Sequence, residues 1–109
     1  MPTSRLDRLQ RDLLEAFFER ETRFFLTGGA ALAGFHLGHR STQDLDLFTT
    51  QAVIDEGATA LAAAARELGA EIEGLRTAPD FRRSLVRRGG ETVVVDLVYA
   101  AIDPRVRIR

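Results

Sequence analysis

The sequence predicts a single α+β domain over residues 1–109, in which helices pack on a mixed β-sheet. Three observations lead to this fold class. Segments with apolar residues at helical spacing alternate along the chain with short apolar or alternating segments that are typical of strands. A pair of glycines near the C-terminus separates two strand-like segments by the spacing of a hairpin. The length of 109 residues and the 45% content of hydrophobic residues are those of one compact domain with its own core.

Apolar residues at helical spacing predict the helices. In the first helix, Ser4 followed by Asp7 resembles a capping box, which favours a start near Ser4. The last helix is rich in alanine, and Gly69 is placed to end it. The predicted helices cover about residues 4–20, 30–37 and 52–68.

Apolar runs, polar–apolar alternation and the turn residues between them predict the strands. The first of these is a short buried strand that Gly28 and Gly29 end. The predicted strands cover residues 23–27, 44–48, 70–75, 81–88 and 91–99.

Gly89 and Gly90 are predicted to form the two-residue loop of a β-hairpin. With a loop of that length, counting back along both strands places Arg83 opposite Asp96. Directly opposed side chains share a face of the sheet, with Cβ atoms about 4.5–5.5 Å apart, so Arg83 can reach Asp96. A three-residue loop would instead move Arg83 to the other face.

The composition excludes several classes of protein and site. The chain has no cysteine, which excludes a disulfide scaffold, a thiolate zinc site and a thiol nucleophile. All 15 basic residues are arginine, which excludes chemistry that depends on a lysine amine. No apolar stretch approaches the roughly 20 residues of a membrane helix, and the N-terminus lacks the apolar region of a signal peptide. We therefore expect a cytoplasmic protein with no membrane partner.

The charges are unevenly distributed along a chain whose formal net charge is −1. Residues 1–75 hold 7 arginines and 12 acidic residues, whereas residues 76–109 hold 8 arginines and 4 acidic residues. The C-terminal third is thus the better candidate for contact with phosphate. Its hairpin arginines fit a solvated strand pair slightly better than a nucleic-acid patch. These are Arg82, Arg83, Arg87 and Arg88.

Asp44 and Asp46 lie two residues apart in a predicted strand, so both carboxylates project from the same face. Adjacent like charges repel each other, and a hard, oxygen-seeking divalent cation such as Mg²⁺ offsets that repulsion. The alternative is an ordinary solvated edge strand, which an isolated Asp-x-Asp more often indicates.

Asp96 interrupts the apolar run VVVDLV, residues 93–98, which is typical of a strand buried on both faces. An unpaired carboxylate in such a strand would cost several kcal/mol, so Asp96 must have a partner. That partner is either an arginine or a metal ion shared with Asp44 and Asp46. Three carboxylates on neighbouring strands are what a two-metal phosphoryl-transfer site requires.

Gly28 and Gly29 fall between a predicted strand and a predicted helix. Without Cβ atoms, such a turn lets backbone N–H groups approach phosphate oxygens at a helix N-terminus. A tight turn also uses glycine for steric reasons alone. Arg40, in the polar stretch before the paired aspartates, is a candidate phosphate clamp, and an ordinary solvent-facing loop is the alternative.

The order of these features resembles the nucleotidyltransferase superfamily, with its polymerase-beta-like fold. Members of that superfamily combine a strand, Gly-Gly, a helix, Asp-x-Asp on the next strand and a third aspartate on a later strand. The stretch LTGGAALAGFHLGHRSTQDLDLFT, residues 26–49, is closely similar to AbiEii/AbiGii-type nucleotidyltransferases, which are abortive-infection toxins. The resemblance covers roughly residues 24–99 and includes the RRGG hairpin and the VVDLV strand.

The resemblance implies a role for each candidate residue. Two Mg²⁺ ions would bind with the nucleoside triphosphate (NTP), and the third aspartate would also help to activate the acceptor hydroxyl. The implied metal-binding and catalytic residues are Asp44, Asp46 and Asp96. Other residues would hold the triphosphate of an NTP such as ATP. The candidate nucleotide-binding residues are Gly28, Gly29, Arg40, Thr42 and Arg83.

The first functional hypothesis is therefore a Mg²⁺-dependent nucleotidyltransferase that moves a nucleoside monophosphate (NMP) from an NTP to RNA, a protein or a small molecule. It would act as the toxin of a toxin–antitoxin or phage-defence system, with an antitoxin as partner. The alternative is a truncated, non-catalytic module of the same fold that binds nucleotide or a partner chain. Members of the family typically continue into a helical C-terminal region, which this chain is expected to lack. The tail RVRIR, residues 105–109, is expected to be mobile or to pair with a sheet edge of this chain or of a second copy.

Overall fold

The computed structural model describes residues 7–27 and 44–101 of the chain. The predicted helix over 30–37 and the tail at 105–109 lie outside the described residues. The described helices are α1 (Arg8–Arg20) and α3 (Ile54–Glu67). The described strands are β1 (Phe25–Leu26), β2 (Asp44–Thr49), β3 (Glu71–Ala78), β4 (Phe81–Arg88) and β5 (Glu91–Tyr99). No helix in this part of the chain is long and apolar enough to cross a membrane.

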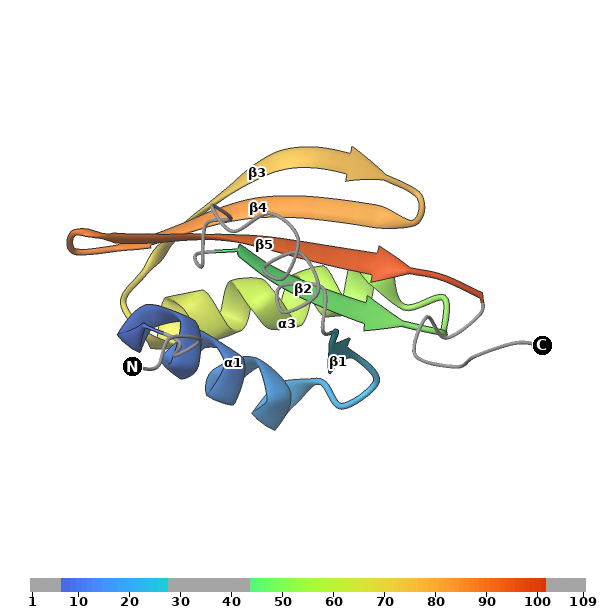
Figure 1. Cartoon of the computed structure of the whole chain (residues 1–109), viewed down its shortest axis with the longest axis horizontal. Coiled ribbons are helices and arrows are strands. Elements are labelled where there is room, and N and C mark those ends of the chain that lie inside the picture. Colours follow the sequence, from blue (N-terminus) through green and yellow to red (C-terminus); the bar gives the residue numbers. More distant parts are fainter. Residues whose placement is uncertain (1–6, 28–43, 102–109) are drawn as a thin grey trace, which may run out of the picture.

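The strands form one mixed sheet in the order β1-β2-β5-β4-β3. β2 and β5 pair in parallel at the centre, and the other neighbouring strands pair antiparallel. The helices α1 and α3 lie side by side on one face of this sheet (Figure 1). The predicted fold class, a mixed sheet with helices packed on it, is therefore confirmed.

The core lies between the helices and the sheet. Buried side chains alternate along β2 and in the middle of β5, as expected for strands with one covered face, whereas β4 has one buried side chain. These side chains are Leu45 and Leu47 on β2, Val86 on β4, and Val93, Val95 and Leu97 on β5. From the helices, leucine, alanine and phenylalanine side chains pack on them, and Phe17 meets the ring of Phe24 edge to face at 5.6 Å.

The first helix begins at Arg8, four residues later than the sequence predicts. The capping box is formed by Asp7 and Gln10 in place of Ser4 and Asp7. The backbone N–H of Gln10 donates to the Asp7 carboxylate at 2.8 Å, and the N–H of Asp7 donates to the Gln10 side chain at 2.8 Å. Gln10 is the third residue of the helix, so this box satisfies the N–H groups of both Asp7 and Gln10. Asp7 is therefore the N-cap of α1.

The buried strand predicted over 23–27 is shorter and less buried than expected. Only Phe25 and Leu26 pair with β2, and Leu26 is exposed at this edge of the sheet. Phe24 is buried against Phe17 of α1 and Gly57 of α3, and the strand begins only after it, at Phe25. The later helix agrees better with prediction, since α3 ends before Gly69, whose positive φ of 70° favours glycine. β3 starts one residue after the predicted position but continues to Ala78, three residues past the predicted end.

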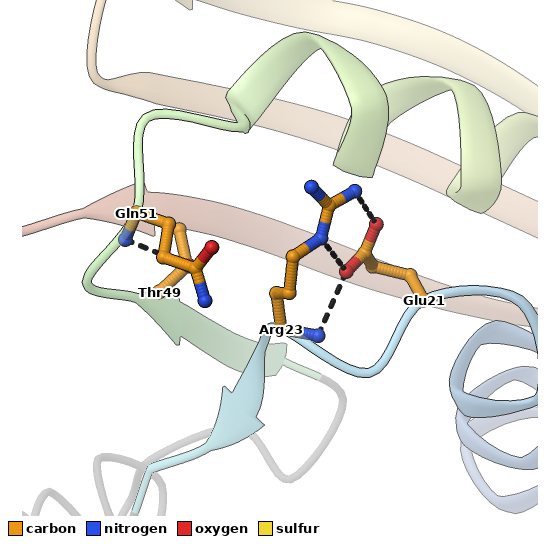
Figure 2. Close-up of polar contacts among 4 residues, drawn as sticks. All are labelled: Glu21, Arg23, Thr49 and Gln51. Carbon is orange, nitrogen blue, oxygen red and sulfur yellow. Dashed lines mark hydrogen bonds and ion pairs between the residues drawn. The ribbon is translucent and has the colours of Figure 1, made fainter.

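The turn between α1 and β1 is held by an ion pair that the sequence pattern did not indicate (Figure 2). The guanidinium of Arg23 donates to both carboxylate oxygens of Glu21, at 2.7 and 2.8 Å, and the backbone N–H of Arg23 adds a third bond at 2.7 Å. The Glu21 side chain is only 4% exposed. Hydrogen bonds from Arg23 lower the pKa of Glu21 below its ordinary value, against the opposing effect of burial.

Glu21→Gln should therefore lower the free energy of unfolding at neutral pH. A carboxyl whose pKa is lowered by folding stabilises the protein above its unfolded-state pKa, and this contribution is lost as the pH falls through the folded-state pKa. The difference between the parent and the variant should consequently shrink in acid. Urea unfolding at pH 7 and at pH 3 measures both differences. Glu19→Gln, an exposed position on α1, is the control, and a gap that widens in acid would contradict this assignment.

Candidate active site

Asp44 and Asp46 lie on the face of the sheet opposite the helices. In β2 the buried and half-buried residues alternate, so Leu45 and Leu47 enter the core while both aspartates remain half-buried on the other face. This is the arrangement that the sequence predicts. The alternation results from the two-residue period of an extended strand, which sends successive side chains to opposite faces.

Asp96 lies beside Asp46 because β2 and β5 pair in parallel with these two residues in register. Register partners share a face, so the three aspartates project from the same side of the sheet centre. Neighbouring strands are about 4.8 Å apart, and residues two apart along a strand are about 6.6 Å apart. The fold thus brings together three carboxylates that are separated by as many as 52 positions in the sequence.

Arg83 holds the carboxylate of Asp96 from the neighbouring strand β4. Its Nε donates to Oδ1 at 2.8 Å and its Nη2 donates to Oδ2 at 3.0 Å, a bidentate ion pair. The two-residue loop at Gly89 and Gly90 produces the predicted register, with Arg83 opposite Asp96. The prediction that Arg83 reaches Asp96 is therefore confirmed.

The surroundings of Asp96 differ from those that the sequence predicts. β5 is fully buried only on its helix side, while Val94, Asp96 and Val98 are half-buried on the other face. The Asp96 side chain is nevertheless only 14% exposed. A carboxylate this deep needs a cation, and within the described residues Arg83 supplies it.

All three aspartates act on the same guanidinium. The hydrogen bonds and charge of Asp96 raise the pKa of Arg83, and the charges of Asp44 and Asp46 raise it further. Arg83 also lies over the ring of Phe81, with its guanidinium carbon 5.4 Å from the ring centroid. Among the described residues, Arg83 is therefore a cation that borders this carboxylate face from β4.

The donor chemistry of this face fits a divalent cation. Carboxylate oxygens are the ligands that Mg²⁺ prefers, and Asp96 is already neutralised by a positive group, the Arg83 guanidinium. Over residues 7–27 and 44–101, no three histidine or acidic side chains are grouped so as to hold a metal ion. The metal-binding role of Asp44, Asp46 and Asp96 thus stays a prediction, and it requires a rearrangement around Asp96.

Four of the predicted nucleotide-binding residues cannot be placed on this face. Gly28, Gly29, Arg40 and Thr42 lie outside the described residues. Their proposed contacts with phosphate stay predictions. The last described residue before them, Thr27, donates its backbone N–H to the carbonyl of Asp46 at 3.0 Å.

Each arginine of the hairpin is paired with a carboxylate. On the helix side of β4, Arg82 binds Asp55 at the start of α3, and Arg88 binds Asp12 of α1 at 3.0 Å. On the other face, Arg87 lies 3.5 Å from Glu73 of β3. These contacts tie helices and strands together and favour the structural interpretation of the arginines over a nucleic-acid patch.

A shallow cavity of about 480 Å³ lies on the helix side, away from the carboxylate face. Its lining joins the turn after α1 to the first half of α3. The lining residues are Arg20, Glu21, Arg23, Asp55, Glu56, Thr59, Ala60 and Ala63. Hydrophobic periodicity and motifs did not predict this cavity, and the one sequence feature that coincides with it is the closely spaced pair of opposite charges at Glu21 and Arg23.

Two comparisons with known proteins bear on this site. The family model described as "Nucleotidyl transferase AbiEii toxin, Type IV TA system" matches residues 11–109. That match includes the whole carboxylate face and the hairpin that carries Arg83. A search of curated proteins found no match.

Proposed function

Because the chain belongs to the AbiEii family of nucleotidyl transferase toxins of type IV toxin–antitoxin systems, we propose that it transfers an NMP from an NTP to an acceptor hydroxyl. The observation that supports this most is the placement of Asp44, Asp46 and Asp96 on one face at the centre of the sheet, with Asp46 and Asp96 in register. The acceptor is an RNA end, a protein or a small molecule.

The proposed reaction is an in-line displacement at the α-phosphorus. The acceptor oxygen forms a bond to this phosphorus, the bond to the bridging oxygen of the β-phosphate breaks, and pyrophosphate leaves with the electron pair. When bound, two Mg²⁺ ions would neutralise the triphosphate and the charge that develops on the leaving group. Asp44 and Asp46 would position the triphosphate through these ions, and Asp96 would orient the acceptor hydroxyl and accept its proton.

The rigid part of the site supports this assignment of roles. All three carboxylates are carried by central, mutually paired strands, so their backbone positions are fixed by the sheet. Gly28, Gly29, Arg40 and Thr42 would bind the phosphates from the segment between β1 and β2. A protein that consumes NTPs would act in the cytoplasm, and an antitoxin would restrain it there.

A transfer assay tests the proposed function. The full chain is incubated with MgCl₂ and each α-³²P-labelled NTP, with total RNA or a cell extract as acceptor. We expect label to appear in RNA, protein or a small molecule with at least one NTP, and to be absent when EDTA is added. Calorimetric titration with each NTP in the presence of Mg²⁺ measures binding in parallel.

The alternative, a module that binds nucleotide without transferring it, also has one observation in its favour. Both oxygens of Asp96 are already committed to Arg83, which is how a structural carboxylate would be satisfied. Nucleotide binding by calorimetry without label transfer to any acceptor would support this alternative over the enzyme.

A further inference from the structure

The ion pair between Arg83 and Asp96 occupies the atoms that a cation at this site would need. Both carboxylate oxygens accept a hydrogen bond from one planar guanidinium, at 2.8 and 3.0 Å. Arg83 on β4 and Asp46 on β2 flank Asp96 from opposite sides of β5, and the bidentate pair engages both oxygens through which Asp96 would bind a cation together with Asp46.

The guanidinium of Arg83 interacts electrostatically with more carboxylates than that of Asp96. Asp44 and Asp46 also stabilise the charged guanidinium, so one fixed cation partly neutralises three carboxylates. A divalent cation that entered among these carboxylates would meet the repulsion of the guanidinium as well as the attraction of the aspartates. Binding of the metal and the ion pair of Arg83 therefore oppose each other.

Arg83 also contacts an aromatic side chain of its own strand, Phe81. Phe81 lies two residues earlier on the same face of β4, and the guanidinium carbon is already 5.4 Å from its ring centroid. A guanidinium that leaves Asp96 retains this cation–π contact, and its planar donors match phosphate oxygens as well as carboxylates. Departure from Asp96 thus leaves Arg83 with other partners.

We propose that Arg83 is an internal competitor of the divalent cation: it holds Asp96 in the metal-free protein and must release it before a cation binds among Asp44, Asp46 and Asp96. This proposal rests on the proposed function, because it takes these three aspartates as the cation site. It makes Arg83 a positioning residue that weakens cation binding until an anion such as the triphosphate offers the guanidinium another partner.

Titration with Mn²⁺ alone, followed by the EPR signal of the unbound ion, tests the proposal. Arg83→Met removes the charge and keeps a long apolar side chain, so we expect Mn²⁺ to bind at least tenfold more tightly than to the parent, a change of about 1.4 kcal/mol. Arg87→Met is the matched control, because Arg87 lies on the same face of β4 but is 3.5 Å from Glu73 of the outer strand. It should change Mn²⁺ affinity less than twofold. Equal or weaker binding by Arg83→Met, or equal gains by both variants, would overturn the proposal.

A second measurement on the parent protein guards against poor folding of the variant. In ¹H–¹⁵N spectra, the Nε–H of Arg83 should show slow exchange with water in the metal-free protein, because it donates to Asp96. Added Mg²⁺ should shift this signal and speed its exchange, and an unperturbed signal at saturating Mg²⁺ would refute competition. The proposed function is judged separately by the transfer of label, so transfer without any effect of Arg83 on metal binding would overturn only this inference.

Discussion

Asp46→Asn should reduce NMP transfer by more than the roughly 100-fold loss that is typical of changes in outer-sphere partners of a metal. The change removes a negative charge from the centre of the carboxylate face, where Asp46 lies in register with Asp96. Asp44→Asn should have an effect of the same order. The measurement is the rate of label transfer from the α-³²P-NTP at saturating MgCl₂.

Both variants should remain folded, because Asn has the same size and the change relieves repulsion between neighbouring carboxylates. Circular dichroism and thermal unfolding verify this. Asp80→Asn, in the exposed turn between β3 and β4, is the control and should keep the parent rate. Transfer at more than a tenth of the parent rate by either active-site variant would show that the carboxylate concerned has no such role.

Gly57→Ala should lower the free energy of unfolding by about 1–3 kcal/mol, although alanine is the better helix former by about 1 kcal/mol. A Cβ atom at this position of α3 would lie 2.5 Å from Cζ and 2.6 Å from Cε1 of Phe24. That ring cannot move aside easily, because it is buried and packs edge-on against Phe17 at 5.6 Å. Urea unfolding followed by circular dichroism gives the free energies.

The contact with Phe24 can be separated from any effect on the helix itself. Phe24→Leu shortens the side chain beneath Gly57, so Gly57→Ala should cost less in that background, as a double-mutant cycle measures. Gly74→Ala, where an added Cβ meets nothing within 4 Å, is the control and should be nearly neutral. A Gly57→Ala protein at least as stable as the parent would contradict the close packing of α3 on Phe24.

The shared face of Asp44 and Asp46 and the pairing of Arg83 with Asp96 were predictable because they depend on local geometry. The two-residue period of strands places Asp44 and Asp46 together, and the two glycines of the hairpin loop set the pair between Arg83 and Asp96. The start of α1 was misplaced because two capping patterns overlap at Asp7, and the pattern that includes Gln10 satisfies both N–H groups. The length of the strand before Gly28 was overestimated because one of its apolar residues, Phe24, packs in the core and does not pair in the sheet.

Contacts between distant elements had no signal in the sequence. The ion pairs of Arg82 with Asp55 and of Arg88 with Asp12 join residues 27 and 76 positions apart. Such pairs depend on how the helices are placed on the sheet, which periodicity does not reveal. The partner of Asp96 was open for the same reason, since a buried carboxylate is neutralised by either an arginine or a metal ion and the sequence pattern does not distinguish them.

The strand order has a consequence for biosynthesis. β5 is the last described strand to leave the ribosome, yet it lies in the middle of the sheet between β2 and β4. Until residue 99 has been made, β2 has only the two-residue strand β1 as a neighbour among the described strands, and the buried residues of both sheet halves lack their shared partner. A nascent chain can therefore form the β3–β4 pair early but cannot assemble Asp44 and Asp46 with Asp96. A fragment that ends before β5 would therefore lack the carboxylate face, which can form only after the last described strand has been synthesised.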